Sequence, residues 1–279
     1  MRVFVCVCLL DSKAIEQIRE VPVTAEKKVY RLERFGPPGA GMAEMTCRPE
    51  DFASAVPTQT LYEYYTDEEL GMSVGVWTTS SMQEAYGPYP GDEFVYLIEG
   101  GFKMVDGDNR TLDTYQQGES VYFRNAAPVS WVQEGHLRKF YITYLNPRRP
   151  VPEGISAKAA VKAVEPSISA DEMVVLDVTD PFIIEGDQPV QRDYVYFTND
   201  SEDMFVGLWD STRFRSEMTP FPTHEFVQLV EGEVVITEEN GTVSRFEPGD
   251  VFFVPKGTVC SWHAPGYVKK YYATVIPNE

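Results

Sequence analysis

The sequence reads Tyr89-Pro-Gly-Asp-Glu93-Phe-Val-Tyr-Leu-Ile-Glu-Gly100 and later repeats itself as Phe221-Pro-Thr-His-Glu225-Phe-Val-Gln-Leu-Val-Glu-Gly232. Landmarks on both sides of these stretches recur at nearly the same spacing. The matching pairs are Trp77 with Trp209, Gly118 with Gly249, Trp131 with Trp262, and the basic pair Arg138-Lys139 with Lys269-Lys270. A repeat this long predicts two domains of similar fold, because the units of solenoid proteins are only about 20–50 residues long.

Both halves are rich in short β-forming runs that are separated by turn sequences. Examples are Glu93–Glu99, Glu231–Thr237, Val251–Val254 and Tyr271–Ile276. The dipeptide Asn240-Gly241 stands between two such runs and predicts a β-hairpin. Many short strands at regular spacing are typical of a sandwich or a barrel, so we expect an all-β protein.

Proline and glycine mark the domain boundaries. The segment Asn146–Gly154 contains three prolines and ends the first half. We expect an N-terminal arm at 1–44, a first barrel at 45–147, a linker at 148–172 and a second barrel at 173–279. Within the linker, Ile155–Val164 predicts a short helix. The apolar run Val3–Leu10 predicts a buried strand, because it is too short to span a membrane and lacks a signal-peptide cleavage site.

The charge of the chain limits its partners. The chain has 24 basic and 43 acidic residues, a net charge of −19. A field of that sign repels phosphate backbones and anionic lipid headgroups, so we expect neither a nucleic acid nor a membrane surface as a partner. The four cysteines form no CxxC pair, which favours a reducing, cytoplasmic compartment.

The repeated motifs resemble those of the cupin superfamily, whose barrels are double-stranded β-helices, or jelly rolls. The first cupin motif ends in a metal-binding Glu, six residues and a Gly, as at Glu225 and Glu93. The second motif fits at Gly249, Pro255 and Gly257, with Cys260 where a metal-binding His is expected. The flanking residues resemble the cupin 3 subgroup, which includes ureidoglycine aminohydrolase-like bicupins. The resemblance implies duplicated cupin barrels and a homodimer.

The metal positions of a cupin are only partly kept. The two early His positions hold Thr219 and Phe221 in the second half, and Gly87 and Tyr89 in the first. A catalytic metal needs about three protein ligands. Glu225, Cys260 and a reoriented His224 could hold one divalent ion (Mn, Fe, Zn or Ni), although strand alternation places His224 and His263 on the outer face. A metal-free barrel is the favoured alternative.

Strand alternation also gives the residues that face each barrel interior. A carboxylate among aromatic side chains is costly unless it is hydrogen-bonded, paired or bound to metal. The expected pocket residues, besides the two glutamates, are Tyr89, Tyr122 and Trp131 in the first half, and Thr219, Phe221, Phe253 and Trp262 in the second. The same residues fit a plain aromatic core equally well.

Three further features of the sequence bear on the chemistry of the site or on the stability of the fold. Cys260 is a candidate nucleophile, or a buried inert thiol. Arg213 and Arg215 alternate to one face, where they could recognise a carboxylate at the pocket mouth or form a solvated edge. The recurring basic pairs Arg138-Lys139 and Lys269-Lys270 predict a repeated structural salt bridge.

Two functions therefore remain. The first is an enzyme that acts on a small polar metabolite, such as a ureido, amino or hydroxy acid, with Glu225 and Cys260 as the catalytic residues of the second barrel. The second is a metal-free ligand-binding or structural cupin without catalysis. The sequence leaves open whether the chain is an enzyme.

Overall fold

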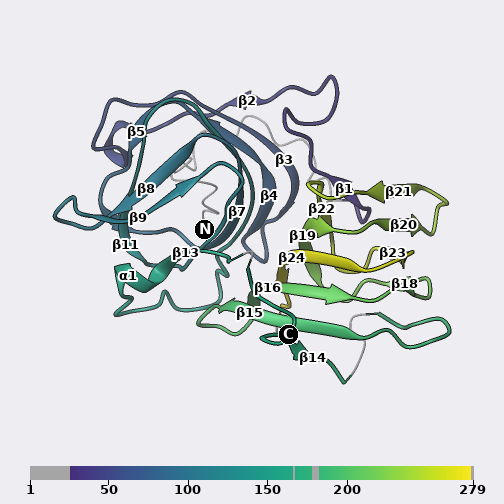
Figure 1. The fold of residues 1–279 in the computed structure, drawn as a ribbon. Helices are drawn as coiled ribbons and strands as arrows, with labels where there is room; N and C mark the ends of the chain where they lie inside the picture. The colour runs from purple at the N-terminus through teal and green to yellow at the C-terminus, as the bar shows by residue number, and fades with distance from the viewer. Residues whose placement is uncertain (1–25, 166, 178–181, 278–279) are drawn as a thin grey trace. The chain divides into compact units, whose positions relative to one another are not determined.

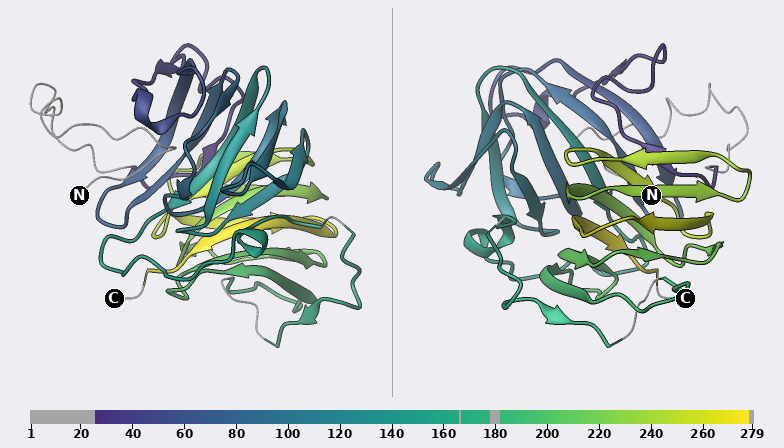
Figure 2. Two further views of the ribbon diagram at one scale, coloured as in Figure 1. Left: turned by 90° about the vertical axis from the view of Figure 1, so that its left-hand side faces the viewer. Right: turned by 45° about the vertical axis from the view of Figure 1, so that its right-hand side comes forward.

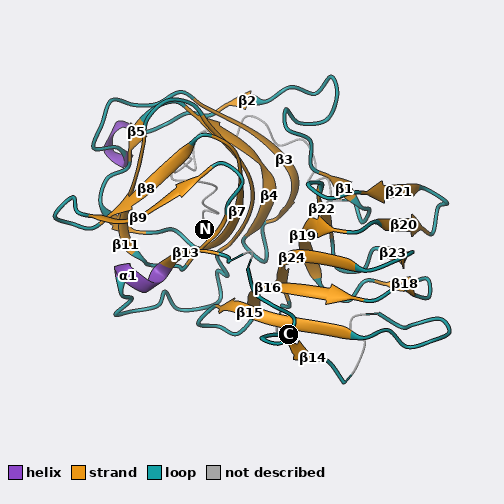
Figure 3. Cartoon of the chain, in the orientation of Figure 1, coloured by secondary structure: helices purple, strands orange, loops and turns teal. Residues whose placement is uncertain are grey.

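The computed structural model describes residues 26–165, 167–177 and 182–277. The run Val3–Leu10, which we expected to form a buried strand, lies outside these residues. The described chain divides into two units. The first unit comprises Glu33–Val164, and the second comprises Lys27–Leu32 together with the chain from Glu165 onward. Strands dominate both units, and the short helical turns belong to the first (Figure 3). No helix within the described ranges is long and apolar enough to cross a membrane.

The first unit contains two sheets that curve around a common core (Figure 1). One sheet has the strand order β13-β10-β7-β12-β4-β3-β2, and the other has the order β5-β11-β8-β9, with β6 also paired to β11. The elements are β2 (Ala43–Glu44), a 3-10 helix (Pro49–Asp51), β3 (Gln59–Asp67), β4 (Met72–Thr79), β5 (Met82–Gln83), β6 (Gly87–Pro88), β7 (Asp92–Glu99), β8 (Gly101–Val105), β9 (Thr111–Gln116), β10 (Ser120–Phe123), β11 (Pro128–Gln133), β12 (Leu137–Tyr144), α1 (Ala157–Ala160) and β13 (Val161–Ala163).

The second unit repeats this strand order, except that its edge strand β1 comes from the N-terminal side of the chain, whereas β13 follows β12. Its sheets have the orders β1-β22-β19-β24-β16-β15-β14 and β17-β23-β20-β21, with β18 also paired to β23. Figure 2 shows the strands of the C-terminal half of the chain in green to yellow, whereas β1 is purple. The strands are β1 (Tyr30–Arg31), β14 (Val174–Val175), β15 (Gln191–Thr198), β16 (Met204–Ser211), β17 (Phe214–Arg215), β18 (Thr219–Pro220), β19 (His224–Glu231), β20 (Val234–Glu238), β21 (Val243–Phe246), β22 (Val251–Val254), β23 (Val259–Ala264) and β24 (Val268–Val275). The repeat in the sequence therefore corresponds to a duplicated all-β fold.

The expected hairpin is present. β20 and β21 pair in antiparallel register, from Val234 opposite Phe246 to Thr237 opposite Val243. Gly241 has a φ of 86°, a left-handed conformation that favours glycine, and the Asn240 side-chain oxygen accepts a hydrogen bond from the Thr242 amide at 2.8 Å. The turn residues thus set the register of the two strands.

The linker and the described part of the expected arm each contribute a strand to one of the two units. The expected helix over 155–164 is reduced to α1, because the chain extends at Val161 and pairs with Phe123 of β10. The segment 27–32, placed in an N-terminal arm by sequence, contributes β1, which pairs with β22 of the second unit. The domain limits at 44, 148 and 172 therefore do not coincide with the limits of the two units.

Gly75 and Gly207, which stand two residues before Trp77 and Trp209, have a packing role. A Cβ atom at Gly75 would lie 2.5 Å from the Tyr62 carbonyl oxygen and 2.6 Å from the Tyr141 hydroxyl oxygen. Tyr141 is almost fully buried and is within 3.3 Å of the Ser73 hydroxyl. Gly207 occupies the same place beside Tyr272 in the second unit. These positions accept no side chain without displacing a neighbouring strand or a buried ring.

We therefore expect Gly75→Ala to destabilise the protein by about 1–3 kcal/mol, the usual cost of overpacking a core. Gly87→Ala is the matched control, because a Cβ atom there meets no atom within 4 Å. Urea unfolding monitored by tryptophan fluorescence measures both. Equal stability of the two variants would contradict the packing role of Gly75.

Candidate functional site

A buried ion pair lies inside the second unit, at the glutamate of the first repeated motif. Glu225 is on β19 and Lys270 is on β24, the neighbouring strand. The Lys270 ammonium donates a hydrogen bond to Glu225 Oε1, and both side chains are at most 5% exposed. β-Strand alternation directs both side chains to the core face, and the long lysine side chain reaches along the strands to the carboxylate.

Aromatic rings surround this lysine. The Lys270 Nζ atom lies 4.8 Å from the ring centroid of Trp209, 4.9 Å from that of Trp262 and 5.7 Å from that of Phe182. Such distances are typical of cation–π contacts, which stabilise a desolvated cation by about 2 kcal/mol or more. The rings therefore offset part of the cost of removing the ammonium from water.

The first unit contains the same arrangement. Lys139 Nζ of β12 lies 2.7 Å from Glu93 Oε1 of β7, and the lysine side chain is fully buried. The ring centroids of Trp77 and Trp131 lie 5.0 Å and 5.1 Å from the ammonium. The Tyr89 hydroxyl donates a hydrogen bond to the other carboxylate oxygen of Glu93. The predicted repeated salt bridge is thus confirmed for Lys139 and Lys270, and it involves the motif glutamates themselves.

The donor set does not fit a divalent cation in either unit. Each motif glutamate already binds an ammonium group, and the other cupin metal positions hold mainly Gly, Tyr, Thr and Phe. A divalent ion beside the lysine would place two like charges among aromatic rings with one carboxylate to balance them. Within the ranges that the structure describes, no group of three His, Cys, Asp or Glu side chains is arranged to hold a metal.

The three residues considered as metal ligands are not brought together. His224 precedes Glu225 in β19, and its ring stacks on Phe253 with centroids 6.2 Å apart. Its Nδ1 atom accepts a hydrogen bond from the Lys256 amide at 3.3 Å. Cys260 lies in the core with Trp262, and burial raises the pKa of its thiol to about 11. The protonated thiol is a poor nucleophile and a poor metal ligand at neutral pH.

Two expected pocket residues face the wrong way. Tyr122 and Phe253 were placed inside the barrels, but the residues that join the cores are Phe123 in β10 and Phe252 in β22. The register explains the error, since Phe123 lies opposite Glu93 and thus shares its face. The remaining expected side chains at the core are Tyr89, Trp131, Phe221 and Trp262, whereas Thr219 is only half-buried. The sequence did not identify Trp77, Trp209 and Phe182 as rings that surround the buried lysines, although the two tryptophans belong to the repeat.

The first unit holds an additional buried acid. Glu84 is 5% exposed, and burial raises the pKa of its carboxyl from 4.5 to about 7. The nearby charge of Lys139 opposes this rise, while the charges of Glu93 and Asp51 add to it. Ser216 occupies the equivalent place in the second unit, where its amide bonds to Trp262 as the Glu84 amide bonds to Trp131. At this position the first interior therefore holds a carboxyl group where the second holds a hydroxyl group.

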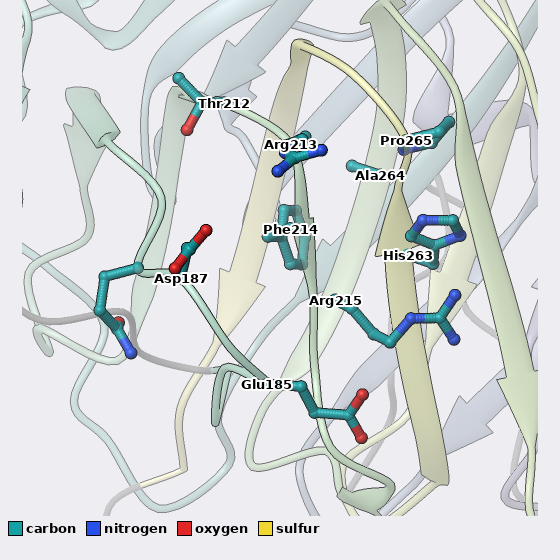
Figure 4. Close-up of a pocket in the computed structure, with 10 residues that line it drawn as sticks. Glu185, Asp187, Thr212, Arg213, Phe214, Arg215, His263, Ala264 and Pro265 are labelled. Carbon is teal, nitrogen blue, oxygen red and sulfur yellow. The ribbon is translucent and has the colours of Figure 1, made fainter.

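A separate pocket of about 450 Å³ lies at the surface of the second unit (Figure 4). Its lining includes Arg213, Arg215 and His263, as well as Glu185 and Asp187. Phe214 points into the core, so the arginines on either side of it point outward. Burial, and the charge of Arg215, lower the pKa of His263, which favours its neutral form at pH 7. The arginines thus line a surface pocket whose lining includes none of the interior residues Phe221, Glu225 and Trp262.

We expect Lys270→Met to destabilise the protein by about 3–5 kcal/mol, because it leaves the Glu225 carboxylate buried without a partner. The double variant Lys270→Met/Glu225→Leu should recover most of this loss. Lys269→Met is the neighbouring control and should cost less than about 1 kcal/mol. Free energies of unfolding in urea give all three values. A double variant as unstable as Lys270→Met alone would show that the ion pair is not the cause.

Glu84 predicts a pH dependence of stability. Because the raised pKa means that the folded state binds this proton more tightly, stability should fall as the pH rises from about 4.5 to 7. Glu84→Gln should remove that fall and stabilise the protein by roughly 1–3 kcal/mol at pH 8, with little effect at pH 4.5. Glu68→Gln, at an exposed site, is the control. The check is the free energy of unfolding measured across this pH range. If both variants lose stability with rising pH as the parent protein does, Glu84 is not the cause of the fall.

Comparisons with known proteins agree with this fold. Residues 198–272 match the family model of the EutQ-like cupin domain. A protein of unknown function from Pseudomonas syringae pv. tomato, which belongs to the DUF861 family, is 23% identical, with a TM-score of 0.71 over 90% of this chain and 100% of that chain.

More distant structures include a cupin 2 conserved barrel domain protein from Leptotrichia buccalis, which is 10% identical over 83% of this chain and 92% of that chain, with a TM-score of 0.49. The oxalate decarboxylase of Lactobacillus farciminis is 11% identical over 92% of this chain and 89% of that chain, with a TM-score of 0.41. No curated protein matches the sequence. The chain therefore has an all-β fold of duplicated cupin barrels, and its second barrel contains the match to the EutQ-like cupin domain.

Proposed function

We propose that this protein is a metal-independent cupin. Its second unit binds a small polar metabolite that carries a carboxylate group. The observation that carries this proposal is the buried lysine on each motif glutamate. An ammonium at this place supplies the positive charge that a metal ion would otherwise supply to the carboxylate. The barrel interior is then balanced in charge without a cofactor.

The same pairing argues against Glu225 as a general base. A base must offer a free lone pair to the substrate within hydrogen-bond reach. The Glu225 carboxylate is instead buried and bound to Lys270, and the neighbouring Cys260 holds its proton. These observations favour ligand binding over catalysis on a ureido, amino or hydroxy acid by Glu225 and Cys260.

The pocket at Arg213 and Arg215 is the binding site that we propose. Its volume of about 450 Å³ suits a small metabolite. Guanidinium groups bind carboxylates through two parallel hydrogen bonds, which gives both affinity and orientation. The site lies at the barrel surface, so a ligand can reach it without opening the buried core.

The proposal predicts binding without metal. Elemental mass spectrometry on untagged protein purified without chelator should find less than about a tenth of an equivalent of Mn, Fe, Zn or Ni. Isothermal titration calorimetry with N-carbamoylglycine, glycine and glycolate, each in the presence of EDTA, should detect binding of at least one of them. Arg215→Gln should weaken that binding about tenfold, the loss of roughly 1.4 kcal/mol.

Arg245→Gln is the matched control, because Arg245 lies on β21 of the same sheet but pairs with Glu233. It should leave the affinity unchanged. Near one equivalent of metal per chain would overturn metal independence. If no probe binds, the pocket proposal fails and a structural role takes its place.

A further inference from the structure

The pocket at Arg213 and Arg215 has an acidic side that sequence analysis did not single out. The segment that contains Glu185 and Asp187 pairs with the chain at residues 215–217, starting from Arg215 at the end of β17. The Glu185 amide donates to the Arg215 carbonyl oxygen at 2.8 Å, and the Glu217 amide donates to the Ile183 carbonyl oxygen at 2.7 Å. These backbone hydrogen bonds fix the acidic residues beside the basic ones.

The acidic side is also fixed by its own turn. Gly186, between the two acids, has a φ of 81°, which side-chain-bearing residues rarely adopt. Beyond it, the Val190 amide donates to the Thr212 hydroxyl at 3.0 Å, and the Thr212 amide donates to the Val190 carbonyl oxygen at 3.0 Å. One end of the acidic loop is therefore tied to Arg215, and the other end is tied to Thr212, the residue before Arg213.

Figure 4 shows how the charged groups surround the pocket. Arg215 and His263 lie on one side and Asp187 lies on the other, with Arg213 and Glu185 at the two ends between them. None of the four charged side chains forms an ion pair within the described residues, although acids and bases share one hollow. The formal charges balance, since two guanidinium groups face two carboxylates and His263 is neutral.

We propose that this pocket binds a zwitterion, a small molecule whose carboxylate meets Arg213 and Arg215 and whose cationic amino group meets Glu185 and Asp187. This inference rests on the proposed function and names its ligand class as amino acids. The charge of the whole chain supports it. A net charge of −19 repels a free anion at long range, but it exerts little net force on a zwitterion.

Paired probes test the two ends of the ligand separately. A panel of α- and ω-amino acids is titrated calorimetrically beside the N-acetyl form of each, which keeps the carboxylate and loses the cation. At least one amino acid should bind at least about fivefold more tightly than its N-acetyl counterpart. Asp187→Asn or Glu185→Gln should abolish this difference while leaving the affinity for the N-acetyl form unchanged.

Glu217→Gln is the matched control, because Glu217 is exposed two residues beyond β17 and does not line the pocket. The affected side chains are exposed, so thermal unfolding should confirm that all variants fold alike. If N-acetyl amino acids bind as tightly as amino acids, the zwitterion inference is wrong while carboxylate binding stands. If neither class binds, the proposed function fails, and this inference fails with it.

Discussion

Burying an ammonium and a carboxylate together in each barrel is the constraint on which the rest of this structure depends. Either charge alone in such surroundings would cost several kcal/mol, so each requires the other and further favourable contacts. Lys139 and Lys270 obtain these contacts from tryptophan rings, and Glu93 obtains one from the Tyr89 hydroxyl. The need to bring two tryptophans around each lysine also explains why the sequence repeats Trp as faithfully as it repeats the motif Glu.

The two units keep this centre but differ around it. In the first, Tyr89 and the buried Glu84 add polar groups to the interior. In the second, Phe221 and Ser216 replace them. Both cores therefore keep titratable groups, because the second retains the Glu225–Lys270 pair and Cys260. The two units share the order of their sheets but differ in the polar groups around the ion pair.

The repeat in the sequence was enough to predict two barrels and two of the side chains that share a face with Glu225, since Phe221 and Trp262 are in the core. It could not place Tyr122 or Phe253, because motif spacing alone does not give the register of β10 and β22 with their neighbours. The sequence predicted salt bridges at the recurring basic pairs, but it did not identify the motif glutamates as their partners. Lys270 and Glu225 are distant in sequence, and the reach of a lysine along a strand leaves no local pattern.

The surface pocket was still harder to predict, because it forms through pairing of residues 183–185 with residues 215–217. Its position nevertheless depends on the barrel core. Phe214, between the two arginines, packs 5.0 Å from Phe182 and 6.0 Å from Trp209, two of the rings around Lys270. Displacing those rings would disturb the packing of Phe214, the residue between Arg213 and Arg215. The buried ion pair therefore lies next to the rings that support the proposed binding pocket, and it does not line that pocket itself.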